Sequence, residues 1–203
     1  RYFASYVPYW LEKTGLPAGQ PASVQAQTGI DGLRADFGQG LPPQLWEYVI
    51  NVARSRKWSF VFMSEALDGG AVTYRSSRHF DVLNENLVFA QQSLTTPDGY
   101  RSAFENRRSA YGQSLLLLNN VSHDEENFQD PWQAFIRYAS SSVNDGVPML
   151  FMGQELGISR TYGFTHYETN MGKQIPHFKI HNSMQPIWDN GDFGLDQLYK
   201  AYA

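Results

Sequence analysis

The segment Gly29–Asp36 places an arginine and an aspartate two residues apart, at the end of an apolar run that glycines interrupt. On a β-strand, residues i and i+2 face the same way, so the Arg34 guanidinium and the Asp36 carboxylate are expected to project together from the strand end. A nearby cation favours the ionised form of a carboxylate, which is the form that a nucleophile needs. The spacing therefore predicts a catalytic carboxylate, although a structural ion pair would show the same pattern.

Further acidic residues follow predicted strands. Phe60–Met63 is a nearly continuous apolar run, typical of a strand buried on both faces of a parallel sheet, and Glu65 follows it after Ser64. Leu115–Leu118 is a second such run, and the pair His123 and Asp124 comes shortly after it. Because parallel strands end at the same rim of a barrel, these carboxylates are expected to gather there with the aspartate of the first segment.

Three carboxylates on one rim suggest glycoside chemistry. Retaining glycosidases place two carboxyl groups about 5 to 5.5 Å apart, one ionised as the nucleophile and one kept protonated as the acid. A phosphate-binding barrel would instead need glycine-rich strand ends near a helix N-terminus. Gly38 and Gly40 before Pro42 match that alternative only weakly.

Amphipathic helices alternate with the apolar strands, which indicates an α/β protein with a parallel sheet. Pro8 is expected to kink or interrupt the first helix, and Asp130 followed by Pro131 is typical of a helix start. The side chains of Trp46 and Trp132 are expected to face the core because of their helical spacing. Helices are predicted over residues 2–13, 43–56, from 87 to about 92, 100–113, from 131 to about 143 and 195–202, and strands around Arg34 and over 58–64, 80–83, 115–118 and 147–152.

Composition excludes several classes of protein. The chain has 203 residues, 42% of them hydrophobic, and a formal net charge of -4, so no basic surface for nucleic acid is expected. Cysteine is absent, which rules out disulfides, Cys-ligated zinc and thiol catalysis. No apolar run approaches the roughly 18 residues of a membrane span, so no membrane partner is expected. The start at Arg1 without a methionine suggests a processed protein or a segment of a longer one.

Four segments together resemble the α-amylase family of glycoside hydrolases (family thirteen). In that family, segments of this kind lie at the ends of the fourth, fifth and seventh barrel strands and along the eighth strand. They correspond here to Gly29–Asp36, Phe62–Ala66, Val121–Asp124 and Val147–Glu155. The resemblance implies a (β/α)8 TIM-barrel fold in which residues 1–203 form a partial catalytic domain covering strands 4 to 8.

The resemblance also implies roles for five residues of this chain. Asp36 would be the nucleophile, Glu65 the general acid/base, and Asp124 the carboxylate that stabilises the oxocarbenium-like transition state. Arg34 would orient the nucleophile, and His123 would hydrogen-bond the sugar in the cleaved subsite. No residue is assigned to a metal.

The expected activity is retaining hydrolysis of α-glucosidic bonds, with α-1,4 bonds of starch-type glucans or maltooligosaccharides as the expected substrate. Two alternatives remain open. A transglycosylase would use the same residues but let a sugar attack the intermediate, and a non-catalytic homologue would only bind carbohydrate. The three retained carboxylates argue against the second alternative, since a binding protein does not need them.

The matched segments account for roughly five of eight barrel strands, which would leave two sheet edges unpaired. We therefore expect the intact protein to supply the remaining barrel segment from its own chain. No organic cofactor is implied. Many relatives bind calcium through segments absent here, so no ligands for a structural calcium ion can be identified. The sequence leaves the compartment open, with an extracellular or periplasmic location slightly favoured.

Overall fold

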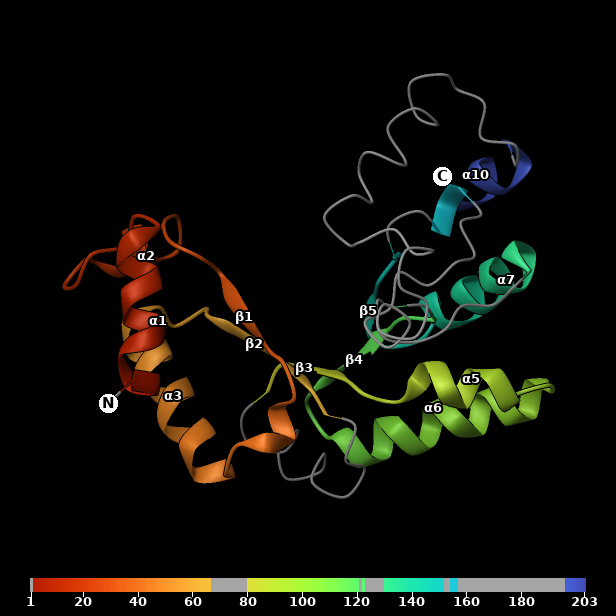
Figure 1. Ribbon diagram of the computed structural model, residues 1–203, viewed down its shortest axis with the longest axis horizontal. Helices are drawn as coiled ribbons and strands as arrows, with labels where there is room; N and C mark the ends of the chain where they lie inside the picture. The colour runs from red at the N-terminus through yellow and green to blue at the C-terminus, as the bar shows by residue number, and fades with distance from the viewer. Residues whose placement is uncertain (1, 67–79, 121, 123–129, 152–153, 157–195) are drawn as a thin grey trace, which may run out of the picture. The chain divides into compact units, whose positions relative to one another are not determined.

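The computed structural model describes residues 2–66, 80–120, 122, 130–151, 154–156 and 196–203. Its strands are β1 (Gly32–Ala35), β2 (Val61–Glu65), β3 (Val82–Asn84), β4 (Leu115–Leu118) and β5 (Val147–Pro148). Its helices are α1 (Tyr2–Lys13), α2 (Ala22–Gln25), α3 (Pro43–Arg56), α5 (Leu87–Ser93), α6 (Pro97–Tyr111), α7 (Pro131–Ser142) and α10 (Asp196–Tyr202), with 3-10 turns at η1 (Gly38–Gly40) and η3 (Gln154–Leu156) (Figure 1).

The strands form one sheet in the order β1-β2-β3-β4-β5, so neighbours in sequence are neighbours in the sheet. The pairs β1–β2, β2–β3 and β3–β4 are parallel. A helix connects each of the pairs β1–β2, β3–β4 and β4–β5, as parallel strands require. Five parallel strands in sequence order with flanking helices correspond to part of a (β/α)8 barrel, which confirms the predicted fold class.

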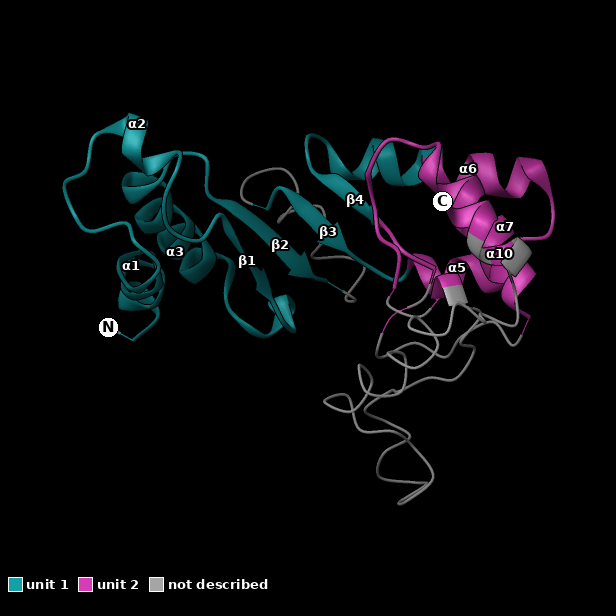
Figure 2. Ribbon diagram, turned by 90° about the horizontal axis from the view of Figure 1, so that it is seen from above, with its two compact units in different colours: residues 1–86, 105–117 teal, residues 87–104, 118–203 magenta. Residues whose placement is uncertain are grey.

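The chain divides into two compact units (Figure 2). The first comprises residues 1–86 and 105–117, and the second comprises residues 87–104 and 118–203. The boundary runs through β4, whose last residue belongs to the second unit. That all 203 residues belong to one catalytic domain stays a prediction.

The core of the first unit lies between β1, β2 and the helices α1 and α3. Val49, Ile50 and Ala53 of α3 are buried at the spacing that the sequence predicts. Trp46 lies one turn earlier, where its indole N–H donates to the Gly38 carbonyl at 2.8 Å and its ring contacts Phe80 edge-on at 5.3 Å. The core position predicted for Trp46 is therefore observed, although its ring keeps a partly exposed edge.

The apolar stripe predicted on α1 is only partly buried. Val7 and Leu11 are almost completely inaccessible, whereas Phe3 and Trp10 are 44% and 40% exposed. Pro8 does not interrupt this helix, which runs unbroken from Tyr2 to Lys13. α1 thus buries an aliphatic face against α3 and keeps an aromatic face accessible.

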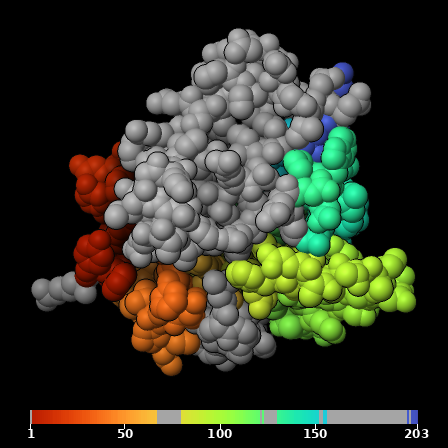
Figure 3. All heavy atoms as spheres, turned by 45° about the vertical axis from the view of Figure 1, so that its right-hand side comes forward, coloured from red at the N-terminus to blue at the C-terminus, as the bar shows by residue number. Residues whose placement is uncertain are grey.

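The core position predicted for Trp132 is wrong. Ala134 and Ser141 are the buried residues of α7, whereas Trp132 is 40% and Ile136 60% exposed. The side chains of α7 lie at the surface in the space-filling view (Figure 3). The predicted start is confirmed, since the Asp130 carboxylate accepts a hydrogen bond from the Trp132 amide at 2.9 Å.

The last predicted strand is shorter than expected. β5 contains only Val147 and Pro148, whereas the apolar pattern predicts a strand to Met152. Proline has no amide hydrogen and cannot donate to a neighbouring strand. One backbone bond continues beyond it, from the Met149 amide to the Leu118 carbonyl at 3.2 Å.

Candidate active site

Arg34 joins the ends of β1 and β2. One guanidinium nitrogen lies 2.6 Å from Asp36 Oδ1, and the other lies 3.3 Å from Glu65 Oε2. The first contact is the one that the two-residue spacing predicts, because i and i+2 side chains leave the strand on the same side. The second contact could not be predicted from spacing, because it depends on the parallel pairing of β1 with β2.

A backbone amide adds a second donor to Glu65. The Phe37 N–H donates to Glu65 Oε2 at 2.7 Å, so the carboxylate oxygen that accepts from this amide also contacts Arg34. Among the described residues, no donor contacts the other oxygen, Oε1. Phe37 adopts a left-handed conformation with φ of 46°, which is uncommon for a bulky residue.

The turn after Asp36 needs a glycine next to the end of β2. A Cβ built on Gly38 would lie 2.1 Å from Ser64 Oγ and 3.0 Å from the Glu65 carbonyl oxygen. Only a residue without a side chain lets the two backbones approach this closely. That Gly38 lets this turn approach the end of β2 is visible only in the structure, because Ser64 and Glu65 are distant from it in the sequence.

The two carboxylates differ in accessibility. The Asp36 side chain is 78% exposed, whereas that of Glu65 is 12% exposed. Water therefore reaches the Asp36 carboxylate freely, whereas the described residues largely shield that of Glu65.

Two of the five predicted site residues remain predictions. His123 and Asp124 lie outside the described residues, so the structure gives no position for them. Ser122, directly before them, is buried. Glu155, which ends the matched segment after the last strand, lies within η3. Its neighbour Gln154 donates to Asn120 Oδ1 at 3.0 Å and to the Tyr202 hydroxyl at 2.9 Å.

A second charged pair follows β3. Glu85 is 3% exposed, and its Oε1 accepts from Arg107 Nε at 2.6 Å. Tyr111, one turn further along α6, is buried beside them, and burial followed by the charge of Glu85 raises the pKa of its hydroxyl well above the ordinary range. Because Arg107 neutralises Glu85, this cluster joins α6 to the end of β3.

The described part of the chain contains no group of three or more His, Cys, Asp or Glu side chains arranged to hold a metal ion. None of the helices in that part combines the length and the apolar character needed to cross a membrane.

Comparisons with known proteins give structural matches. No protein-family profile and no curated protein sequence matches the chain. Among solved structures, an α-amylase from Anoxybacillus aligns with a TM-score of 0.60 and 16% identity, over 78% of this chain and 36% of that one. A noncanonic maltogenic α-amylase, AmyB from Thermotoga neapolitana, aligns with 0.59 and 16%, over 78% and 35%. The cyclic α-maltosyl-(1→6)-maltose hydrolase of Arthrobacter globiformis aligns with 0.58 and 16%, over 77% and 35%.

The chain has the fold of part of an α-amylase catalytic barrel. It spans about a third of the length of the solved structures that it matches. In such a barrel the helices surround the sheet, so the face of each strand that packs on a helix is the outer face.

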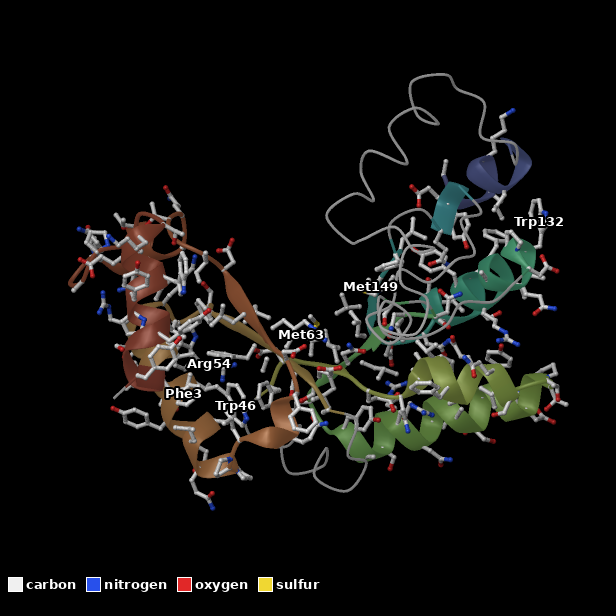
Figure 4. All side chains as sticks on the ribbon, viewed as in Figure 1. Phe3, Trp46, Arg54, Met63, Trp132 and Met149 are labelled. Atoms are coloured by element: carbon white, nitrogen blue, oxygen red, sulfur yellow. The ribbon has the colours of Figure 1, made fainter. Side chains whose placement is uncertain are left out.

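The amylase-type barrel fold identifies the inner face of this sheet. Phe62 of β2 is completely buried and its ring approaches that of Phe80, which contacts Trp46 of α3. Phe62 therefore points outward, and the alternation of strand residues turns Met63 and Glu65 inward. Figure 4 labels Trp46 of α3 and Met63 of β2.

Strand register extends this assignment to β1 and β3. Arg34 pairs with Met63, and Glu65 pairs with Asn84, in the parallel ladder. Register partners in a sheet point to the same face. Arg34, Glu65 and Asn84 therefore share the inner face, at or near the carboxyl ends of three consecutive strands, where barrels of this kind build their active sites.

Proposed function

We propose that this chain is part of an α-amylase-family glycoside hydrolase that cleaves α-glucosidic bonds with retention of configuration. The observation that supports this most directly is the Arg34 bridge between Asp36 and Glu65, at the carboxyl ends of adjacent strands in an amylase-type fold. A single guanidinium can bridge two carboxylates only when they lie a few ångströms apart, in keeping with the roughly 5 to 5.5 Å of retaining enzymes.

In the proposed first step, Asp36 is the nucleophile. Its carboxylate oxygen forms a bond to the anomeric carbon while the bond from that carbon to the glycosidic oxygen breaks. Glu65 donates its proton to the departing oxygen, so the leaving sugar departs as a neutral alcohol. Oε1 is the oxygen of Glu65 that we expect to carry the proton, because Oε2 accepts from Phe37 and Arg34.

The second step reverses the proton transfer. Glu65, now ionised, removes a proton from water as the water oxygen bonds to the anomeric carbon, and the bond to Asp36 breaks. Two displacements at the same carbon retain its configuration. Asp124 and His123 are proposed, from the family resemblance, to stabilise the oxocarbenium-like transition state and to hold a sugar hydroxyl.

The proposed substrates are α-glucans or maltooligosaccharides. The solved structures with this fold include enzymes named as a maltogenic α-amylase and a cyclic maltosyl-maltose hydrolase, and one of them was solved with maltose. An oligosaccharide of α-linked glucose is therefore the substrate class that these matches support. An α-1,4 linkage is the first to test.

We also propose that the remaining barrel strands come from the same polypeptide and pair with β1. β1 lies at one end of the strand order, so one of its edges has no partner strand among the described residues. A cavity of about 250 Å³ is lined by Arg34 and by mostly apolar residues of α1, β1, α3 and β2. Unpaired edges and exposed aromatic faces favour association with further strands and helices.

The activity is tested with the full-length polypeptide that carries this chain, incubated with maltooligosaccharides and with 4-nitrophenyl α-maltosides. We expect cleavage with retention of configuration. Nuclear magnetic resonance measures it by identifying the anomer that is released first. Asp36→Asn and Glu65→Gln are each expected to lower kcat by at least several hundredfold. Added azide should restore turnover of activated glycosides in a Glu65→Gly variant, because azide needs no general base.

Asp98→Asn is the matched control. Asp98 is an exposed carboxylate on α6 that also pairs with an arginine, Arg101, at 3.1 Å. Its substitution should leave kcat at the wild-type value. Reducing ends that accumulate indicate hydrolysis, and redistribution of chain lengths indicates the transglycosylase alternative. Unchanged turnover in Asp36→Asn would contradict the proposal and favour a protein that only binds carbohydrate.

A further inference from the structure

Asn84 is a buried polar residue whose amide oxygen lacks a partner. Its side chain is 8% exposed, and Oδ1 accepts no hydrogen bond from the described residues. Buried side-chain oxygens of native proteins are nearly always hydrogen-bonded, because an unpaired one keeps the cost of losing its water. An unsatisfied oxygen at this place in the fold is therefore a candidate acceptor for a bound ligand.

The position of Asn84 indicates where that partner lies. Asn84 is the register partner of Glu65, and the Asn84 carbonyl accepts from the Ala66 amide at 2.8 Å. Adjacent strands lie about 4.8 Å apart, so the two side chains leave the inner face one strand spacing from each other. A sugar held by Glu65 would therefore reach Asn84 with its ring hydroxyls.

Polar residues at neighbouring strand ends differ in whether they have partners. Glu85, the next residue, is buried too, but Arg107 satisfies it. Asn120, which follows β4, is also a completely buried asparagine, and there Nδ2 donates to the Ala134 carbonyl while Oδ1 accepts from Gln154. Asn119, which directly follows β4, is completely buried, and neither polar atom of its amide has a partner among the described residues. The strand ends of the described chain thus hold two unsatisfied asparagines, and Asn84 is the one that pairs with Glu65 in the strand register.

We propose that Asn84 is a substrate-binding residue, whose Oδ1 accepts a hydrogen bond from a hydroxyl of the glucose unit that contacts Glu65. This inference rests on the proposed function, since it assigns a further contact to the same site. An amide oxygen suits an uncharged hydroxyl donor. A site built to hydrogen-bond a hydroxyl rejects an analogue that lacks it, because the buried acceptor then stays unpaired.

The test uses the full-length polypeptide and a panel of 4-nitrophenyl α-glucosides or maltosides in which single hydroxyls of the reacting glucose are replaced by hydrogen. Asn84→Leu removes the acceptor at similar volume. We expect kcat/KM for the parent substrate to fall about 3- to 10-fold, as the loss of one neutral hydrogen bond predicts. With the wild type, kcat/KM for one deoxy analogue should be lower than for the parent substrate by a similar factor. With Asn84→Leu, kcat/KM for that analogue should equal that for the parent substrate, because the two changes remove the same hydrogen bond.

Asn84→Asp keeps an acceptor oxygen and is the conservative variant. It should still discriminate against the same deoxy analogue. Asn120→Leu is the matched control, since it removes an asparagine that the protein itself satisfies. The urea midpoint of the unliganded protein should rise in Asn84→Leu, which removes an uncompensated buried oxygen, and fall in Asn120→Leu.

The outcomes separate two failures. If the wild type cleaves the parent glycosides but Asn84→Leu still discriminates against every deoxy analogue as the wild type does, the inference is wrong and the proposed function stands. If Asn84→Leu lowers the urea midpoint as Asn120→Leu does, Asn84 has a structural role and the inference is also wrong. If the wild type cleaves no α-glucoside of the panel, the proposed function and this inference fail together.

Discussion

Lys57 provides the sharpest test of how this fold positions its candidate site. Its side chain is 1% exposed, and its ammonium lies 2.6 Å from Asp31 Oδ1 and 3.0 Å from the Thr28 carbonyl oxygen, with the carbonyls of Gly29 and Ile30 at 3.5 and 3.3 Å. These acceptors belong to the segment that leads into β1. One buried ammonium thus fixes the approach to the strand that carries Arg34 and Asp36.

Replacing Lys57 by methionine keeps most of the apolar stem and removes the donors. Hydrogen bonds from a charged donor contribute about 1.5 to 3 kcal/mol each to stability. The close contacts with Thr28 and Asp31 therefore set the upper limit of the loss in free energy of unfolding. The Asp31 contact needs a discount, because that carboxylate is 87% exposed and water can replace the ammonium. We therefore expect Lys57→Met to lower the free energy of unfolding by about 2 to 3 kcal/mol.

Asp31→Asn separates the two kinds of contact. If the carbonyls carry most of the stabilisation, this substitution should cost about 1 kcal/mol or less, as for exposed ion pairs. The measurement is urea unfolding of the full-length polypeptide, with tryptophan fluorescence and circular dichroism as coincident probes. An equal loss in Asp31→Asn and Lys57→Met would refute the reasoning, because it would assign the stabilisation to the ion pair.

Three further changes test other contacts. Gly38→Ala should lower the free energy of unfolding by about 1 to 3 kcal/mol, since its Cβ would meet Ser64 Oγ, and Ser64→Ala should recover part of that loss in thermal melts. Arg107→Met should cost about 3 to 5 kcal/mol in urea unfolding by leaving Glu85 buried without its partner, and the double variant with Glu85→Leu should recover most of it. Burial raises the pKa of Tyr202 to about 12. The contribution of its protonated hydroxyl to the free energy of unfolding is therefore complete below pH 10 and is lost as the pH rises toward 12. Stability measured between pH 9 and 12 should therefore fall less in Tyr202→Phe than in the wild type, and equal slopes would contradict the assignment.

The strands and helices could largely be predicted from the sequence. Residues 43–56 form α3 as the proline start and the apolar spacing predict, and Leu115–Leu118 form β4. These signals are local, because hydrophobic periodicity reports which side of an element is buried. They were insufficient where a partner determines burial, so α1 and α7 expose aromatic side chains that the same periodicity assigns to a core.

Charged residues show the same division. Basic residues at the end of a helix can complement the helix dipole, but Lys57 after α3 is buried against the segment before β1, and Arg54 pairs with Asp81 at 2.8 Å. The position of a basic residue at a helix end does not by itself show which acceptor it contacts. Each depends on an acceptor 26 or 27 residues away in the chain.

By itself, the sequence determined the order of strands and helices, the Arg34–Asp36 pair and the likeness to α-amylases, because residue type and short spacing carry these signals. Only the tertiary structure decided that Arg34 also reaches Glu65, that the Phe37 amide supports the same carboxylate, and that Asn84 shares their face with an amide oxygen that no described residue satisfies. Each of these follows from the register of parallel strands. That register is set by packing between distant segments and leaves no mark in the spacing of neighbouring residues.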